Sequence, residues 1–105
     1  MKTSNIFANI PKQLEDELFE DIVSKNNLKI ERIISYGHSS PKSGWYDQEN
    51  DEWVILLQGE AVLSYEIADD VHLKAGDYIN IPAHTKHKVS WTLPKSKTIW
   101  LAIHF

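Results

Sequence analysis

After a short extended start at NIFANI, the chain up to residue 27 carries apolar side chains at the spacing of an α-helix. The apolar positions of this stretch are Leu14, Leu18, Phe19, Ile22 and Val23. Pro11 suits a first helical position, and the acidic residues at 15, 16 and 17 suit the positive end of a helix dipole. The pattern therefore predicts one short amphipathic helix that ends near the stretch SKNN and docks onto the body of the protein.

From residue 28 onward the pattern alternates with a period of two, which is typical of β-strands. Turn sequences such as SSPKSG, QGE, KAGD and PAHT separate the alternating segments. The pattern predicts strands near 28–36, 45–48, 52–58, 61–67, 71–73, 77–81, 86–92 and 98–104. Short strands without intervening helices indicate a sandwich or barrel. We therefore expect one domain over 1–105, with an extension and helix over 1–27 and a barrel over 28–105.

Two polar residues are predicted to point into this barrel. Glu52 opens the apolar run EWVILLQ and lies on the same side of its strand as Val54 and Leu56. His87 alternates with two lysines, which strongly prefer solvent, so its imidazole is predicted to face inward. An ionised carboxylate is costly to bury unless it is paired or bound to a metal. We therefore expect Glu52 to meet His87 or a metal ion, and the same alternation places Trp91 beside His87.

Composition and charge exclude several classes of function. The 105 residues are 42% hydrophobic and contain no cysteine, so disulfides and thiolate chemistry are excluded. No apolar run approaches the roughly 20 residues that cross a bilayer, so no membrane association is expected. The net charge of −4 leaves no basic stripe for nucleic acid. The N-terminus lacks the apolar core of a signal peptide, and we therefore expect a cytoplasmic protein.

Two stretches, GWYDQENDEWVILLQG and GDYINIPAHTKHKV, resemble the two sequence motifs of the cupins, which are small jelly-roll β-barrels. The first cupin motif ends in a glutamate, six residues and a glycine, and the second contains a proline followed by a histidine. The matching residues are Gly44, Glu52, Gly59, Gly76, Pro82 and His87. The resemblance covers roughly residues 28 to 105 and implies an all-β fold, a cupin jelly-roll barrel with the short N-terminal α-helix as an addition.

The sequence departs from the cupin pattern where metal ligands are expected. The two histidines of the first motif are replaced by Tyr46 and Gln48, or by Trp45 and Asp47 if the gap before the glutamate is one residue longer. In the second motif His84 stands in place of a glycine. Trp91 stands in place of the terminal asparagine. Of the three imidazoles and one carboxylate that a metal-binding cupin typically offers, the resemblance leaves only the equivalents of Glu52 and His87.

Two interpretations of Glu52 remain open. In the first, Gln48, Glu52 and His87 hold one divalent metal ion, such as zinc, iron, nickel or manganese. In the second, the same groups form a hydrogen-bonded cluster, in which Glu52 accepts a hydrogen bond from His87 or from the Tyr46 hydroxyl. In both cases we expect these polar groups to converge inside apolar and aromatic walls, which is how small-molecule binding pockets are usually built. Its predicted wall includes Tyr46, His84 and Trp91.

Two classes of function are consistent with these residues. The first is a cupin that binds a small polar or acidic metabolite without converting it, with or without a weakly held divalent metal. The second is a small metal-dependent enzyme of isomerase, lyase or dioxygenase type, in which Glu52, His87 or Tyr46 moves a proton. The missing imidazoles favour binding over redox chemistry, because non-haem iron sites use two histidines and one carboxylate. The sequence identifies neither the ligand nor a reaction.

The remaining predictions concern the other histidines and the assembly. His38, His72 and His104 are predicted to be surface or structural residues. A homodimer is predicted, because the chain is short and its strand at 52–58 is apolar on both faces. The apolar stretch NIFANI near the N-terminus could add to a neighbour's sheet in such a dimer.

Overall fold

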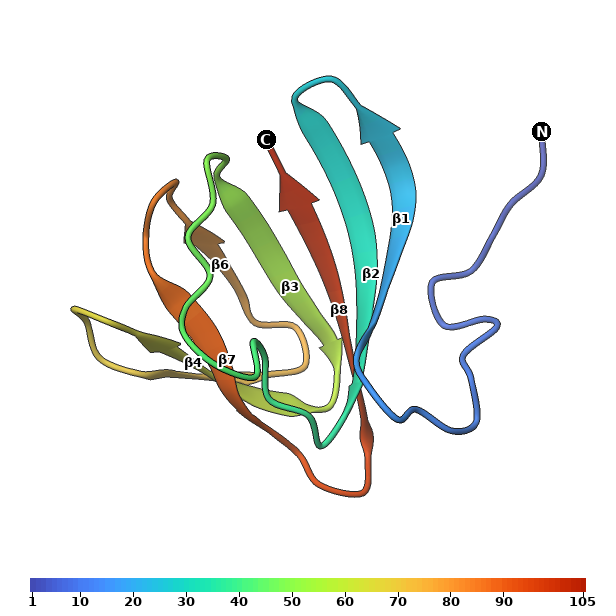
Figure 1. Ribbon diagram of the computed structural model, residues 1–105. Coiled ribbons are helices and arrows are strands. Elements are labelled where there is room, and N and C mark those ends of the chain that lie inside the picture. Colours follow the sequence, from blue (N-terminus) through green and yellow to red (C-terminus); the bar gives the residue numbers. More distant parts are fainter.

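The computed structural model describes residues 1–105, which form eight β-strands and no helix (Figure 1). The strands are β1 (Leu18–Lys25), β2 (Leu28–Tyr36), β3 (Glu52–Gln58), β4 (Glu60–Tyr65), β5 (Val71–Lys74), β6 (Tyr78–Ile81), β7 (His87–Thr92) and β8 (Lys97–His104). A five-stranded antiparallel sheet has the order β1-β2-β8-β3-β6, and a three-stranded sheet has the order β5-β4-β7. The all-β prediction is confirmed. No helix is present that could cross a membrane.

The predicted N-terminal helix is wrong, because its second half is strand β1. This strand pairs with β2 through a hairpin whose turn contains Asn27 at φ +62°. The register shifts between Asp21 and Val23, which identifies Ile22 as an extra residue in a β-bulge. The bulge interrupts the period of two, so that the apolar side chains of this strand are spaced like those of a helix.

The two sheets share one apolar core. It is built from buried side chains of five strands: Val54, Leu56, Ala61, Leu63, Leu73, Ile81, Trp100 and Ala102. These residues belong to β3, β6 and β8 of the larger sheet and to β4 and β5 of the smaller one. Glu52 at the start of β3 and His104 at the end of β8 pair with each other in the sheet and do not belong to this core.

The N-terminal segment is fixed to the outer face of the larger sheet by Arg32 of β2. One guanidinium nitrogen of Arg32 donates hydrogen bonds to the carbonyl oxygens of Ile6 and Ala8, at 2.8 and 2.7 Å. A second nitrogen lies 2.6 Å from the carboxylate of Glu20 on β1. The stretch NIFANI thus lies against the chain's own sheet, and Figure 1 shows the N-terminal segment beside β1 and β2.

The homodimer remains a prediction. The outer face of the larger sheet carries Trp53 and Tyr78 with their ring centroids 5.4 Å apart, and Tyr78 is 66% exposed. An apolar patch of this kind favours association. We expect light scattering at micromolar concentration to give about twice the chain mass of 12.1 kDa. A mass near 12.1 kDa would contradict the prediction.

Candidate functional site

A cavity of about 70 Å³ lies between the two sheets, beside the core. Its wall includes apolar side chains such as Ile33, Leu63 and Trp100. Its polar lining consists of Glu17, Glu31, Ser40, Tyr46, Gln48, Glu52, His87 and His104. A volume of this size admits several water molecules or part of a small ligand. The cavity therefore combines apolar walls with convergent polar groups, as small-molecule sites usually do.

Glu52 and His87 meet inside this cavity, as the sequence predicted. The Nε2 atom of His87 lies 3.4 Å from Oε1 of Glu52, and both residues are buried. The other ring nitrogen, Nδ1, lies 2.7 Å from the carbonyl oxygen of Thr85. Because a carbonyl only accepts, Nδ1 carries a proton and donates it to Thr85. Nε2 is thereby directed toward the carboxylate of Glu52.

The surroundings of His87 favour its protonated form. Burial by itself would lower the pKa of His87, but the hydrogen bonds to Glu52 and to the Thr85 carbonyl and the negative charge of Glu52 together raise it. The net direction is upward, and protonation of His87 gives the pair the character of a charge-assisted hydrogen bond. The geometry is that of a buried acid–imidazole pair.

The raised pKa of His87 predicts a pH dependence of stability. A group whose pKa is higher in the folded state stabilises the fold fully below its unfolded value, about 6.5 for histidine. This contribution is lost as the pH rises through the folded pKa. We therefore expect the melting temperature to fall from pH 6 to 8 in the wild type. The fall should be smaller in His87→Gln and unchanged in His84→Gln, whose imidazole is exposed. Equal slopes in all three proteins would contradict the prediction.

A second acid–imidazole pair, Glu31 with His104, lines the same cavity. The Nε2 atom of His104 lies 2.7 Å from Oε1 of Glu31, and both residues are buried. Burial would raise the pKa of Glu31, but the hydrogen bond to His104 and the positive charges of Lys29 and His104 lower it overall. Lys29 Nζ lies 3.6 Å from the other oxygen of Glu31. Glu31 is therefore held as a carboxylate.

Sequence reasoning missed this second pair. His104 was predicted to be a surface or structural residue, yet it is buried in the cavity wall. The signal was the alternation along β8, where Thr98, Trp100, Ala102 and His104 are all buried. Its position next to the C-terminus concealed that alternation. His104 also pairs with Glu52 in the β3–β8 register, so the two acid–imidazole pairs are neighbours on the inner wall.

Tyr46 and Gln48 reach the cavity from an extended segment beside β7. Tyr46 and His87 exchange backbone hydrogen bonds of 2.8 and 3.1 Å, which form an isolated bridge. The strand predicted at 45–48 is reduced to this bridge. The Tyr46 hydroxyl is hydrogen-bonded to Ser40, and its pKa is raised by burial and by the charges of three nearby carboxylates. Oε1 of Gln48 is buried without a hydrogen-bond partner.

The residues present do not fit a metal centre of the usual cupin kind. Gln48, Glu52 and His87 line one cavity, but no group of three His, Cys, Asp or Glu side chains is arranged to hold an ion. The second imidazole of the cavity, His104, is engaged by Glu31. The polar part of the site thus consists of two acid–imidazole pairs.

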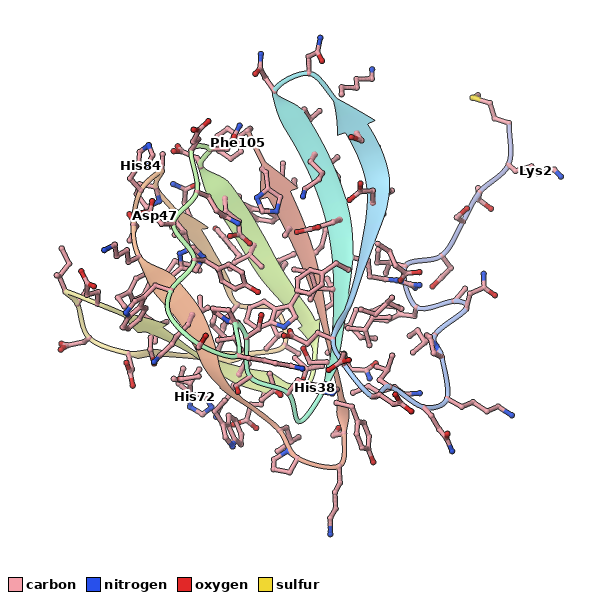
Figure 2. All side chains as sticks on the ribbon, viewed as in Figure 1. Lys2, His38, Asp47, His72, His84 and Phe105 are labelled. Carbon is pink, nitrogen blue, oxygen red and sulfur yellow. The ribbon has the colours of Figure 1, made fainter.

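His84 and Asp47 lie at the rim of the barrel, outside the cavity. Nδ1 of His84 is 3.1 Å from Oδ1 of Asp47, and both side chains are substantially exposed. Figure 2 shows the two residues beside each other at one edge of the molecule. His38 and His72 also lie outside the cavity lining, as predicted for surface residues. Gln48 and Asp47 are the two residues that could stand in place of the second histidine of the first motif. Gln48 lines the cavity, and Asp47 does not.

The structure also places Trp91 outside the cavity, so the prediction from its alternation with His87 is wrong. In the β4–β7 ladder Val62 pairs with Trp91 and Leu63 pairs with Val89, which leaves Ser90 as an extra, bulged residue. The Ser90 hydroxyl is hydrogen-bonded to Ser64, at 2.7 Å. A bulge reverses the alternation that follows it, so Trp91 turns to the outer face and is 37% exposed.

A wider groove opens outward from the cavity, and we call it the vestibule. It is lined by Phe19, Asp21, Ser24, Lys25, Asn27, Leu28, Lys29, Glu31, Tyr46, Gln48, Asn50 and His104. Its volume is about 770 Å³, and five of its residues also line the inner cavity. A ligand that reaches the inner cavity would therefore pass between the β1–β2 hairpin and the segment around residues 46–50 (Figure 1).

The cupin-domain family model matches residues 33–104 of this sequence. The chain belongs to the cupin family. A similar crystal structure, from Ralstonia eutropha JMP134, is that of a "putative mannose-6-phosphate isomerase"; it has 41% sequence identity and a TM-score of 0.92 over 99% of this cupin and 97% of the other chain. A comparison with curated proteins found no match.

More distant solved structures share the fold. A cupin superfamily protein from Desulfitobacterium hafniense DCB-2 has 22% identity and a TM-score of 0.76, with coverage of 91% of this cupin and 83% of that chain. An RmlC-like cupin with a double-stranded β-helix fold from Methanocaldococcus jannaschii has 16% identity and a TM-score of 0.73, with coverage of 90% and 84%. The structural similarity to these proteins confirms the expected jelly-roll architecture.

Proposed function

We propose that this cupin binds a small polar metabolite in the inner cavity, with the remainder of the ligand in the vestibule. The observation that carries the proposal is the presence of two buried acid–imidazole pairs in one partly apolar cavity. Buried polar groups that only stabilised the fold would normally be satisfied among themselves. Here Oε1 of Gln48 is buried without a hydrogen-bond partner, and the carboxylate of Glu52 keeps further acceptor capacity toward the cavity. The site is therefore suited to hydroxyl groups of a ligand.

A second candidate function is the isomerisation of a phosphorylated sugar. It is supported by the printed name of the relative with 41% identity and by the contact between Glu52 and His87. In an aldose–ketose interconversion, a base removes a proton from the carbon beside the carbonyl while an acid protonates the carbonyl oxygen. The conjugate acid of the base then returns a proton to the former carbonyl carbon, while the neighbouring hydroxyl gives up its proton. The Glu52 carboxylate could act as that base, with protonated His87 beside it as a proton donor. The imidazole of His87 would take up the proton of the neighbouring hydroxyl, so that both residues return to their starting protonation states.

The experiment is a titration of the protein with mannose and mannose 6-phosphate, followed by calorimetry and by the NMR signals of the His87 and His104 rings. We expect binding at micromolar to millimolar concentration that shifts both imidazole signals. Glu52→Gln should weaken this binding, and His84→Gln, at the rim, should leave it unchanged. If a broad panel of hydroxylated metabolites failed to bind at millimolar concentration, the binding function would be contradicted.

A separate measurement decides between the two candidates. The formation of the ketose isomer from mannose 6-phosphate is followed at enzyme concentrations high enough to detect a few turnovers per hour. Turnover that is abolished in Glu52→Gln and retained in His84→Gln would support the isomerase. Binding without turnover would support a protein that holds its ligand without converting it.

A further inference from the structure

The inner cavity has an excess of negative charge. Three carboxylates line it, from Glu17, Glu31 and Glu52, whereas no lysine or arginine does. The only groups that can carry positive charge there are the imidazoles of His87 and His104. Even with both imidazoles protonated, the carboxylates outnumber them. An anionic group placed inside this low-dielectric cavity would therefore be repelled.

Glu17 is the carboxylate that accounts for the excess. Glu52 is paired with His87 and Glu31 with His104, but Glu17 contacts no cationic side chain. Its one hydrogen bond comes from the hydroxyl of Ser35, at 2.9 Å. The preceding residue, Asp16, is oriented differently and lies 3.2 Å from Lys42. Glu17 therefore adds a negative charge to the cavity that no ion pair neutralises, although Lys42 and His38 lie with it along a separate surface groove.

The negative charges of the three carboxylates all act on the hydroxyl of Tyr46. Burial raises the pKa of the Tyr46 hydroxyl, and the charges of Glu17, Glu52 and Glu31 raise it further. Tyr46 lines both the inner cavity and the vestibule, so the field of the carboxylates is felt where the two meet. A cavity with this field favours groups that donate hydrogen bonds over groups that accept them.

The vestibule differs because it contains lysines as well as the carboxylates of Asp21 and Glu31. Lys25 and Lys29 line it, and Lys25 forms no ion pair with an acidic side chain. Lys29 lies 3.6 Å from Glu31, at the boundary with the inner cavity. Lysine side chains are thus available to a ligand at the mouth of the barrel, whereas the imidazoles at the inner end are each paired with a carboxylate.

We infer that the ligand binds with a hydrogen-bond-donor end, a hydroxyl or an ammonium group, in the inner cavity beside Glu17, while any acidic group of the same molecule remains in the vestibule near Lys25 and Lys29. The inference rests on the proposed function and adds the orientation and charge class of the ligand. It assigns Glu17, which lies before β1 and outside both acid–imidazole pairs, as the residue that sets this selectivity.

The test uses three sugars that differ only at carbon 6: 6-amino-6-deoxymannose, mannose and mannuronate. Binding of each is measured by calorimetry to the wild type, Glu17→Gln and Lys25→Gln. We expect Glu17→Gln to weaken binding of the amino sugar about tenfold and binding of mannuronate much less. Lys25→Gln should weaken binding of mannuronate about threefold and leave binding of the amino sugar unchanged. The matched controls are Asp16→Asn, whose carboxylate faces Lys42, and Lys74→Gln, which lies outside cavity and vestibule.

The outcomes separate this inference from the proposed function. A crossed dependence, in which the amino sugar depends on Glu17 and the acidic sugar on Lys25, supports the orientation. If mannuronate gained as much from Glu17→Gln as the amino sugar lost, its carboxylate would occupy the inner cavity and the inference would fail while the binding function stood. If none of the three sugars shifted the ring signals of His87 and His104, the inference would fail, and the broad panel of hydroxylated metabolites would decide the binding function separately.

Discussion

Replacing His87 by alanine is expected to lower the free energy of unfolding by about 3 kcal/mol, because it leaves the Glu52 carboxylate buried without its partner. The side chains of His87 and Glu52 are only 5% and 11% exposed, and their contact lies inside the cavity wall. We take the lower end of the usual range, since the adjoining cavity can admit water to solvate the carboxylate. Chemical denaturation at pH 7 measures the loss directly.

Two further variants test the cause of this loss. The double replacement Glu52→Gln with His87→Gln removes both charges and should recover part of the stability. The matched control is the exposed pair of Glu60 and His72, whose atoms lie 2.6 Å apart with His72 51% exposed. His72→Ala should cost less than about 1 kcal/mol, as is usual for surface pairs. A similar cost for both histidines would refute a special role for burial.

Gly59→Ala is expected to be at least as damaging, with a loss of about 3 kcal/mol or more. Gly59 joins β3 to β4 with φ +92°, a conformation that residues with a Cβ rarely adopt. A Cβ at this position would lie 2.4 Å from Oγ1 of Thr98 and 2.8 Å from its Cα. Because Thr98 is fully buried in β8, its backbone cannot move away without displacing the strand. Thermal or chemical unfolding measures the difference.

The control for this variant is Gly76→Ala. Gly76 has nearly the same φ, +95°, but no atom lies within 4 Å of an added Cβ. Its replacement should therefore cost only the conformational strain, roughly 1–2 kcal/mol. Equal losses at the two glycines would show that the contact with Thr98 does not matter.

The sequence was sufficient to predict the barrel and one half of its polar site. Glu52 could be placed because it opens an apolar strand, and His87 because lysines flank it on both sides. The regular alternation of β3 carried this argument, and the contact between the two residues is present at 3.4 Å. The cupin resemblance, drawn from the spacing of glycines around the same residues, is confirmed by the family match over 33–104.

The features that the sequence did not predict share physical causes, chiefly β-bulges. β1 and β7 each contain a bulge, and a single extra residue changes which side chains face inward. The bulge at Ile22 made a strand look helical, and the bulge at Ser90 moved Trp91 from the inner to the outer face. Glu31 was missed because both faces of β2 are covered, the outer one by the N-terminal segment bound to Arg32. Polar and apolar residues therefore do not alternate along this strand.

The bulge at Ser90 also means that the size of the cavity depends on chain length as well as on side-chain identity. His87 and Val89 precede the extra residue and line the cavity, whereas Trp91 follows it and does not. Removing one residue at this point would restore simple alternation and turn the indole inward. A relative with a one-residue deletion here could thus have a largely filled barrel while keeping every acid and imidazole of the site. The size of the cavity in such proteins can therefore change through the length of β7 alone.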